Sequence, residues 1–198
     1  MDTDILEKYL QEKIFPELET GRPGIDRPHT EGVVYHLKRI INNTPELNLD
    51  KPVLLIAAYA HDWGYAKLFK AGQALQMADV ANAKNEHMIK GSQLVTSLVQ
   101  DPFFNFLSDE QKTRAIHLVE VNDKLEILKD FDELVLMEAD TLGGLDTSFY
   151  QPTFNKESND KYMQNVLEKR FPKFITTFGK QEFPRLFKMR QDFYSNKE

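Results

Sequence analysis

The sequence predicts an all-α fold, a compact helical bundle without β-strands. Three observations support this prediction. Apolar residues recur at helical spacing in several segments, no segment shows a convincing two-residue alternation, and helix-capping or helix-ending residues flank the helical segments. With 198 residues, of which 41% are hydrophobic, the chain is long enough to bury one core, so we expect one domain over residues 1–198.

Three helices are expected in the first part of the chain, over residues 3–15, 30–41 and 51–61. Glycine and proline within residues 21–28 predict a loop that leads to His29 at the start of the second helix. Residues 42–45, Asn-Asn-Thr-Pro, end that helix. Asp50 is suited to be the N-cap of the third helix, which is almost wholly apolar and must be buried on most sides. Gly64 is suited to a left-handed residue beyond its end.

The second part of the chain is expected to contain helices over residues 79–99, 108–121, 131–140, 160–170, 172–178 and 181–194. An irregular stretch over residues 69–76 precedes them. Asp101 and Pro102 end the first of these helices, and residues 108–111, Ser-Asp-Glu-Gln, match a capping box at the start of the next. The glycine pair at 143–144 is expected to end the segment that contains Asp140.

Composition excludes several classes of protein. The chain has no cysteine, so disulfides and thiolate ligands are impossible, and any metal site must use His, Asp or Glu. The start is acidic and lacks an apolar signal region, and the apolar run over residues 53–60 is too short to cross a bilayer. A net charge of −6 argues against a nucleic acid polymer as a partner. We therefore expect a soluble, cytoplasmic protein that binds no membrane and whose ligand is a small molecule.

The dipeptide His61-Asp62 is the first candidate for chemistry. It ends an apolar run of eight residues, where burial of two ionisable groups without partners would cost several kcal/mol. Joint coordination of one cation would satisfy both groups. The ordinary alternative is a helix-end pair, with Asp62 solvated and His61 bonded to the backbone, and for the dipeptide alone this alternative is favoured. His29 and Asp140 shift the balance, because each ends or begins another expected helix and three helices can converge on one point.

The ordered set of a His, a His-Asp pair and a distant Asp resembles the HD-domain superfamily of metal-dependent phosphohydrolases. His29, with the apolar Val33 four positions later, lies 32 residues before the pair and matches the first His of that family. Residues 55–64 are similar to the apolar helix that ends in His-Asp-x-Gly, and Asp140 is similar to the final ligand. His36 fits the first position less well.

The resemblance implies a metal centre made of His29, His61, Asp62 and Asp140. It would hold one divalent cation, of which Mn, Fe, Co, Ni, Zn and Mg suit mixed nitrogen and oxygen ligands. A metal-activated water would then attack the phosphorus of a phosphate ester. Asp62 is assigned a second role as the base that accepts a proton from this water, and Glu86 is a weaker candidate for proton transfer.

Two departures from the family pattern affect the substrate-binding residues. Many members carry a Lys where this chain has Tyr65, so phosphate contact is assigned to Lys67, two positions on. Members with two metals carry two additional His residues. His87 resembles the first of them, whereas the place of the second is closer to Asn122 than to His117. A site for one metal is therefore expected, with His87 facing the substrate or, as the alternative, lying on the helix surface.

The side chains around the pair have an ordinary interpretation that is favoured over a functional one. The aromatic residues that could wall a pocket, but are expected in the core, are Trp63, Tyr65 and Phe69. The basic residues that could meet a phosphate, but are expected to be solvated surface charges, are Arg22, Arg27, Lys84 and Lys90.

The resemblance covers residues 26–145, and the helical extension over residues 152–198 matches no known pattern. The extension could cover the core or form the face of a homodimer. The function implied is hydrolysis of a small phosphate ester, in the first place a nucleotide. The alternative is a ligand-binding or regulatory module with weak or no catalysis, and a di-iron oxygenase ranks last because it needs more ligands than the chain offers.

Overall fold

The computed structural model describes residues 2–22, 24–69 and 77–195. The described part is all-α, as the sequence predicts, and it contains no strand. The helices are α1 (Thr3–Leu18), α2 (Asp26–Asn43), α3 (Lys51–Ala60), α4 (Met77–Asn82), α5 (Lys84–Leu98), α6 (Asp109–Val121), α7 (Phe131–Leu145), α8 (Lys156–Asn165) and α9 (Thr177–Ser195). Short helical turns lie at Pro45–Leu47, Trp63–Tyr65, Pro102–Phe104, Val166–Arg170 and Phe171–Lys173, of which Val166–Arg170 is a π turn.

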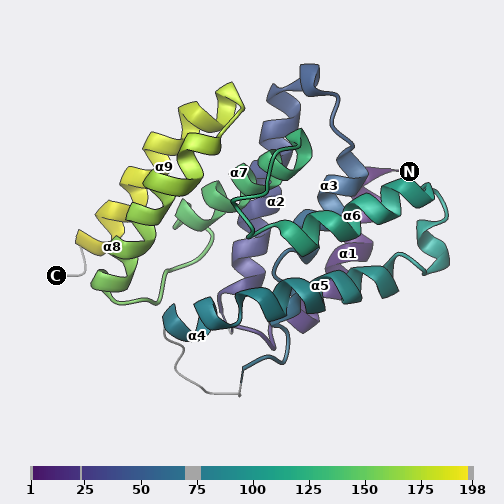
Figure 1. The fold of residues 1–198 in the computed structure, drawn as a ribbon, viewed down its shortest axis with the longest axis horizontal. Helices are drawn as coiled ribbons and strands as arrows, with labels where there is room; N and C mark the ends of the chain where they lie inside the picture. Colours follow the sequence, from purple (N-terminus) through teal and green to yellow (C-terminus); the bar gives the residue numbers. More distant parts are fainter. Residues whose placement is uncertain (1, 23, 70–76, 196–198) are drawn as a thin grey trace.

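Helices α2 and α7 form the centre of the molecule and pack extensively against each other (Figure 1). Helix α3 contacts both, and α1 and α6 pack on its other sides, whereas α5 packs on α6 and on the turn Trp63–Tyr65. Helices α8 and α9 lie at the opposite side of the molecule, where α9 packs on α7 and α2. None of the described helices has the combination of length and hydrophobicity that crossing a membrane requires.

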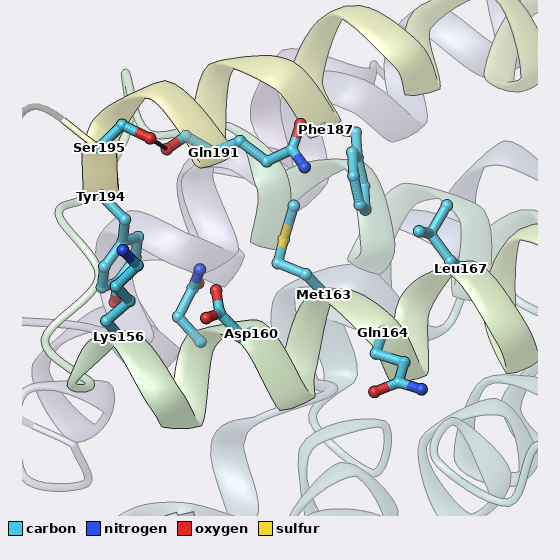
Figure 2. Close-up of a pocket in the computed structure, with 10 residues that line it drawn as sticks. Lys156, Asp160, Met163, Gln164, Leu167, Phe187, Gln191, Tyr194 and Ser195 are labelled. Atoms are coloured by element: carbon cyan, nitrogen blue, oxygen red, sulfur yellow. Dashed lines mark hydrogen bonds between the residues drawn. The ribbon is translucent and has the colours of Figure 1, made fainter.

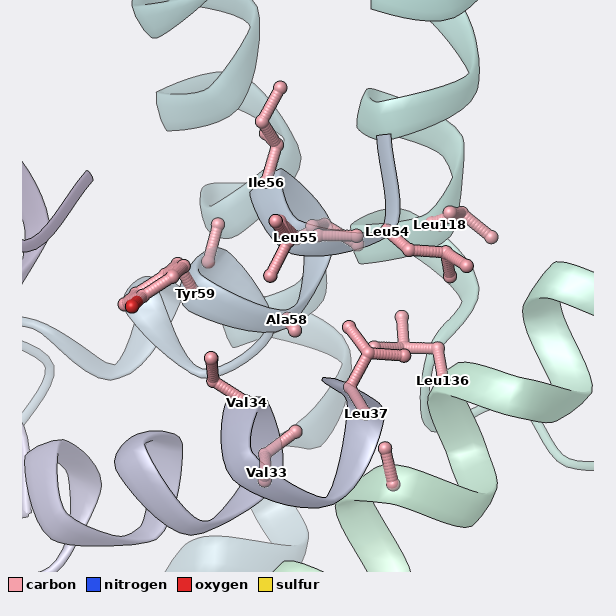
Figure 3. Packing of buried hydrophobic residues seen from close by; sticks show 14 of the residues in the cluster. Val33, Val34, Leu37, Leu54, Leu55, Ile56, Ala58, Tyr59, Leu118 and Leu136 are labelled. Atoms are coloured by element: carbon pink, nitrogen blue, oxygen red, sulfur yellow. The ribbon is translucent and has the colours of Figure 1, made fainter. Parts of the chain in front are cut away.

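Helix α3 is the central element of the hydrophobic core, as expected from its apolar sequence. All residues from Val53 to Ala60 are buried. In Figure 3 their side chains meet Val33, Val34 and Leu37 of α2 on one side, and Leu118 and Leu136 from α6 and α7 on another. The Asp50 carboxylate caps the helix by accepting a hydrogen bond from the backbone nitrogen of Val53 at 3.1 Å. The chain thus leaves the core at the end of α3, where the His-Asp pair begins.

The glycine pair at 143–144 does not end α7, which continues to Leu145. The expected boundary is wrong because these glycines serve the packing of helices. A Cβ atom on Gly143 would lie 2.8 Å from the backbone nitrogen and 3.0 Å from the Cα of Val33 in α2. Only a residue without a side chain lets the backbones of α2 and α7 approach this closely, so His29 and Asp140, one turn before Val33 and Gly143 respectively, are brought together.

Other helix boundaries also differ from the expected ones. The segment expected at 79–99 is divided at Ala83 into α4 and α5. The helix expected at 160–170 begins earlier, where Asn155 caps α8 through the backbone nitrogen of Ser158, and it gives way to the π turn after residue 165. In the segment expected at 172–178, the short turn Phe171–Lys173 is followed by residues 174–176 without helix, and α9 begins at Thr177 rather than at the expected residue 181. Residues 70–76 of the expected irregular stretch lie outside the described residues.

Gly64 is needed for a reason other than the expected one. Its φ angle is not positive, so it does not act as a left-handed helix end. It lies instead in the turn Trp63–Tyr65, pressed against α5: a Cβ atom would overlap the carbonyl oxygen of His87 and lie 2.8 Å from the backbone nitrogen of Gly91. Gly64 therefore lets α5 approach the end of α3.

We predict that Gly64→Ala lowers the free energy of unfolding by about 1–3 kcal/mol, because backbone must move to accept the methyl group. Gly91→Ala is the matched control, since its Cβ would come close to one side-chain atom, Cγ1 of Val119 at 3.0 Å, and would keep ordinary contact distances of 3.5 and 3.8 Å to the backbone of Gly64 and Ala60, and the helix gains from alanine. Urea unfolding of both variants measures the difference. An equal effect of the two substitutions would contradict the packing role of Gly64.

Candidate metal centre

Three side chains from three helices converge into a compact group. His29 lies in the first turns of α2, His61 directly follows α3, and Asp140 lies in α7. The Nε2 atom of His29 is 3.0 Å from Oδ1 of Asp140 and 3.2 Å from Nε2 of His61. The distance between Nε2 of His61 and Oδ1 of Asp140 is 3.7 Å. This group could hold a metal ion. The structure therefore brings together residues that are 111 positions apart in sequence.

Asp62 joins this group from one side. Its Oδ2 atom lies 3.4 Å from Nε2 of His61 and 3.7 Å from Nε2 of His29, and the same oxygen accepts a hydrogen bond from Arg22. The Asp62 side chain is only 9% exposed, so it is not the solvated carboxylate of an ordinary helix end. Three of the four residues predicted as ligands thus form the compact group, and Asp62 lies beside it, within 3.7 Å of both histidines.

The His61 ring is oriented by the backbone. Its Nδ1–H donates a hydrogen bond to the carbonyl oxygen of Ala58 at 2.8 Å. A neutral ring that donates through Nδ1 presents an unprotonated Nε2, which is the form that binds a metal. The hydrogen bond from His61 to the backbone, which is also expected for an ordinary helix-end pair, is therefore present. It leaves Nε2 of His61 free to bind a ligand.

The carboxylates and the cationic side chains of the group each stabilise the charged form of the other. Burial disfavours a charged His61, but the carboxylates of Asp62 and Asp140 outweigh it and raise the pKa of His61 to about 9. Burial likewise opposes the ionised form of Asp140, but the Arg170 guanidinium and the two histidines hold the pKa of its carboxyl well below the usual range. The carboxylates are thus ionised and attract a cation, whether a proton on His61 or a metal ion.

Arg22 forms one flank of the centre. Its guanidinium bonds both Asp26 and Asp62 and lies 4.2 Å from the centre of the Tyr65 ring. Its side chain is only 13% exposed, so the expectation of a solvated surface charge is wrong for this residue. Arg27 does pair with surface glutamates, as expected.

Arg170 forms the opposite flank and has no counterpart among the predicted site residues. Its Nη1 donates to Oδ2 of Asp140 at 2.6 Å and to Oγ1 of Thr141 at 3.1 Å, and its Nη2 donates to Asp123 at 2.7 Å. Lys84 also pairs with Asp123, at 3.2 Å. Asp123 follows Asn122, which is near the position where family members with two metals carry their second additional His. No local sequence signal marks Arg170, because its partners lie 30 and 47 residues away.

His87 is buried beside the centre, so a place on the helix surface is excluded. Its ring stacks on Tyr65, with ring centres 4.1 Å apart and planes within 9°. Its Nε2 lies 3.9 Å from a carboxylate oxygen of both Asp62 and Asp123, and neither ring nitrogen has a hydrogen-bond partner. Burial lowers the pKa of His87. A neutral imidazole with unused nitrogens therefore faces two carboxylates.

The centre opens into a cavity of about 480 Å³. Basic residues that line it are Arg22, Lys84, Lys161, Arg170 and Arg190. Apolar and aromatic residues that line it are Ile25, Tyr65, Val80, Tyr150, Pro152, Phe154 and Tyr162. Tyr65 is thus a wall residue, whereas Trp63 is buried in the core as expected. Many of these residues belong to the segment after Leu145, so the C-terminal extension forms one wall.

Three residues predicted for catalysis or substrate binding are not among those that line this cavity: Lys67 and Glu86, which are exposed, and His87, which is fully buried beside the centre. Lys67 is exposed and pairs with Glu17 of α1 at 3.4 Å. Glu86 is exposed on α5 and is not among the residues that line the cavity. Sequence proximity to the His-Asp pair and to His87 suggested Lys67 and Glu86, but the turn after α3 directs Lys67 toward α1, and adjacent residues on a helix point in different directions.

A second hollow, of about 360 Å³, lies between α8 and α9 (Figure 2). Met163, Phe187 and Leu167 form its apolar part, with Lys156 and Asp160 at the other end. It contains a single carboxylate and no histidine among its described lining residues. The cavity at the metal centre is therefore the better candidate for chemistry.

Comparisons with known proteins identify no relative: no family model matches the chain, and no curated protein or solved structure gives a significant match. The case for a function therefore depends on the geometry of the centre and on the resemblance of its ordered residues to the HD pattern.

We predict that His29→Ala lowers the metal content of the purified protein to below a tenth of that of the wild type, because it removes a nitrogen from the group. His36→Ala is the matched control: it also removes a buried His of α2 that faces an Asp, in this case Asp146 at 2.9 Å, outside the group. This control is expected to lose stability, by roughly 1–3 kcal/mol, and to keep its metal. The metal content of both variants is measured by mass spectrometry after dialysis. An equal loss of metal from the two variants would contradict the assignment of His29 to a metal centre.

Proposed function

We propose that this protein is a metal-dependent phosphohydrolase of the HD type that acts on a small phosphate ester, in the first place a nucleotide. The observation that carries the proposal is the group of His29, His61 and Asp140, joined by Asp62, at the floor of a cavity with basic walls. Metal-ligand residues and phosphate-binding charges at one place are the requirements for this reaction.

The donor set fits a divalent cation of borderline or hard character. Two imidazole nitrogens and two carboxylates are available, and Mn, Fe, Co, Ni, Zn and Mg all accept such ligands. A cation bound there would supply Lewis acidity toward water and toward the phosphoryl oxygens of the substrate. The hydrogen bond from His61 to Ala58 and the arginine contacts of Asp62 and Asp140 hold three of the four ligands in place.

The balance of charge supports an anionic substrate. Around the centre, the carboxylates of Asp26, Asp62, Asp123 and Asp140 are matched by the cations Arg22, Lys84 and Arg170. One negative charge is left over when the histidines are neutral. A divalent cation therefore makes the centre positive by one charge, and Arg190 adds to this in the cavity, whereas the charge of Lys161 is balanced by Glu157 at 2.7 Å. A phosphate group would be attracted to such a site.

Asp62 is the residue best placed to take a proton from an attacking water. Arg22 and the histidines keep it ionised by holding its pKa below the usual range, against the effect of burial. Glu86 lies exposed outside the cavity and is a poorer candidate than Asp62 for this role. His87 is fully buried and does not line the cavity, but its free ring nitrogens, of which Nε2 lies 3.9 Å from Asp62, are suited to hydrogen-bond a buried water beside that carboxylate.

The phosphate contacts are better assigned to the cavity than to Lys67. Lys84 and Lys161 line the cavity with 44% and 72% of their side chains exposed, so both can reach a ligand, and each also pairs with a carboxylate, Lys84 with Asp123 at 3.2 Å and Lys161 with Glu157 at 2.7 Å. Lys67 pairs with Glu17 and is not among the residues that line the cavity. Tyr150, Phe154 and Tyr162 offer apolar surface for the organic part of the ester. A homodimer through the C-terminal extension remains a prediction.

We expect the purified protein to release phosphate from one or more of a panel of mono-, di- and cyclic nucleotides and sugar phosphates when Mn²⁺, Co²⁺ or Mg²⁺ is added. Asp62→Asn should lower this rate by at least about 100-fold, because it removes a ligand charge and a base. Asp146→Asn, which changes a buried carboxylate outside the centre, should keep most of the rate.

The released phosphate and the bound ligand are measured separately. A wild-type protein that binds a nucleotide without releasing phosphate would favour the ligand-binding or regulatory module over the enzyme. Wild-type activity in Asp62→Asn would contradict the assignment of the centre.

A further inference from the structure

Arg170 links the C-terminal extension to the metal centre. We propose that it is a positioning residue that fixes the Asp140 carboxylate so that one oxygen faces the ion. The inference rests on the metal centre of the proposed function and not on the hydrolysis itself. Residue 170 also lies outside residues 26–145, where the resemblance to the HD pattern ends, so the pattern assigns it no role.

The two oxygens of Asp140 have separate partners. Oδ1 lies 3.0 Å from Nε2 of His29, whereas Oδ2 accepts a hydrogen bond from Nη1 of Arg170 at 2.6 Å. The same Nη1 donates to Oγ1 of Thr141 at 3.1 Å, which fixes the guanidinium relative to α7. Rotation of the carboxylate would break the bond to Arg170. Oδ1 is therefore held toward the histidines before any ion binds.

Asp123 holds the other end of the guanidinium. Nη2 of Arg170 donates to Oδ1 of Asp123 at 2.7 Å, and Lys84 balances the second negative charge. The side chains of Arg170, Asp123 and Asp140 are each at most 15% exposed, so these charge-assisted bonds are poorly screened by water. A planar guanidinium can bridge two carboxylates, whereas a lysine ammonium acts as a point charge on a flexible stem.

The backbone that delivers Arg170 has an unusual form. Val166–Arg170 is a π turn between α8 and the turn Phe171–Lys173. Single π turns are rare and occur often at functional sites, because the extra residue changes the direction of the side chains that follow. Val166 is fully buried, and the Phe171 ring stacks on Phe183 of α9 with ring centres 4.0 Å apart. Packing on both sides thus fixes the turn that aims Arg170 at Asp140.

Mn²⁺ affinity of the full chain tests this role, measured by calorimetric titration after removal of metal with a chelator. Removal of the positive charge of Arg170 would by itself strengthen the binding of a cation. A weaker Mn²⁺ affinity therefore indicates that the Asp140 carboxylate has lost its orientation. We expect Arg170→Gln to weaken Mn²⁺ binding by about 10–100-fold, the usual effect of removing a hydrogen-bond partner of a ligand. Arg170→Lys should recover part of the affinity.

Arg190→Gln is the matched control. Arg190 is also a buried arginine of the C-terminal extension that lines the same cavity, but it donates to Asn159, Tyr150 and the carbonyl oxygen of Gly144. Its loss should lower stability and leave the Mn²⁺ affinity within about threefold of the wild type.

Three results would overturn the inference: Arg170→Gln binds Mn²⁺ as tightly as the wild type or more tightly, Arg190→Gln weakens binding equally, or the wild type binds no Mn²⁺. Only the last also removes the metal centre. If Arg170→Gln does not fold, Arg170→Lys decides, and wild-type affinity in that variant would contradict the role. If the wild type binds Mn²⁺ but hydrolyses no substrate, the proposed function is overturned. The positioning role of Arg170 would then still be tested by the Mn²⁺ affinities of the variants.

Discussion

Buried carboxylates need compensating charge, and the candidate metal centre is organised around this need. Asp62 follows the end of α3 and Asp140 lies within α7, both in a largely dehydrated place where an unpaired charge would be costly. Arg22 and Arg170 meet these two side chains from opposite flanks. In Asp140 the oxygen that faces His29 is not the one bonded to Arg170, whereas in Asp62 the same oxygen faces the histidines and accepts from Arg22. We therefore propose that the arginines influence where a cation can bind as well as balancing the charge.

The packing of the helices brings these groups within reach of one another. The apolar helix α3 is buried in the core, and His61 and Asp62 directly follow its last residue. The absence of a side chain at Gly143 lets α7 approach α2, and the same absence at Gly64 lets α5 approach the turn after α3. Stability and function are coupled here, because the contacts that close the core also set the distances between the proposed ligands.

The sequence was sufficient for the helical class and for the residues of the centre that have a fixed order. His29, His61 and Asp140 were predicted from their order and spacing, which resemble the HD pattern, together with their places at the expected beginnings or ends of helices, and the structure brings the three side chains together. Arg170 could not be found, because its role depends on a π turn and on partners far away in the sequence. Lys67 was misplaced for a related reason: a pattern gives the distance along the chain, but the turn after α3 decides the direction of the side chain.

We propose that one divalent ion binds between His29, His61 and Asp140, with Asp62 beside it. Anomalous diffraction from crystals grown with Mn²⁺ tests this binding most directly. We predict one strong peak per chain, within about 2.0–2.3 Å of Nε2 of both histidines and of Oδ1 of Asp140. A peak elsewhere in the cavity, or no peak from protein crystals saturated with Mn²⁺, would contradict it.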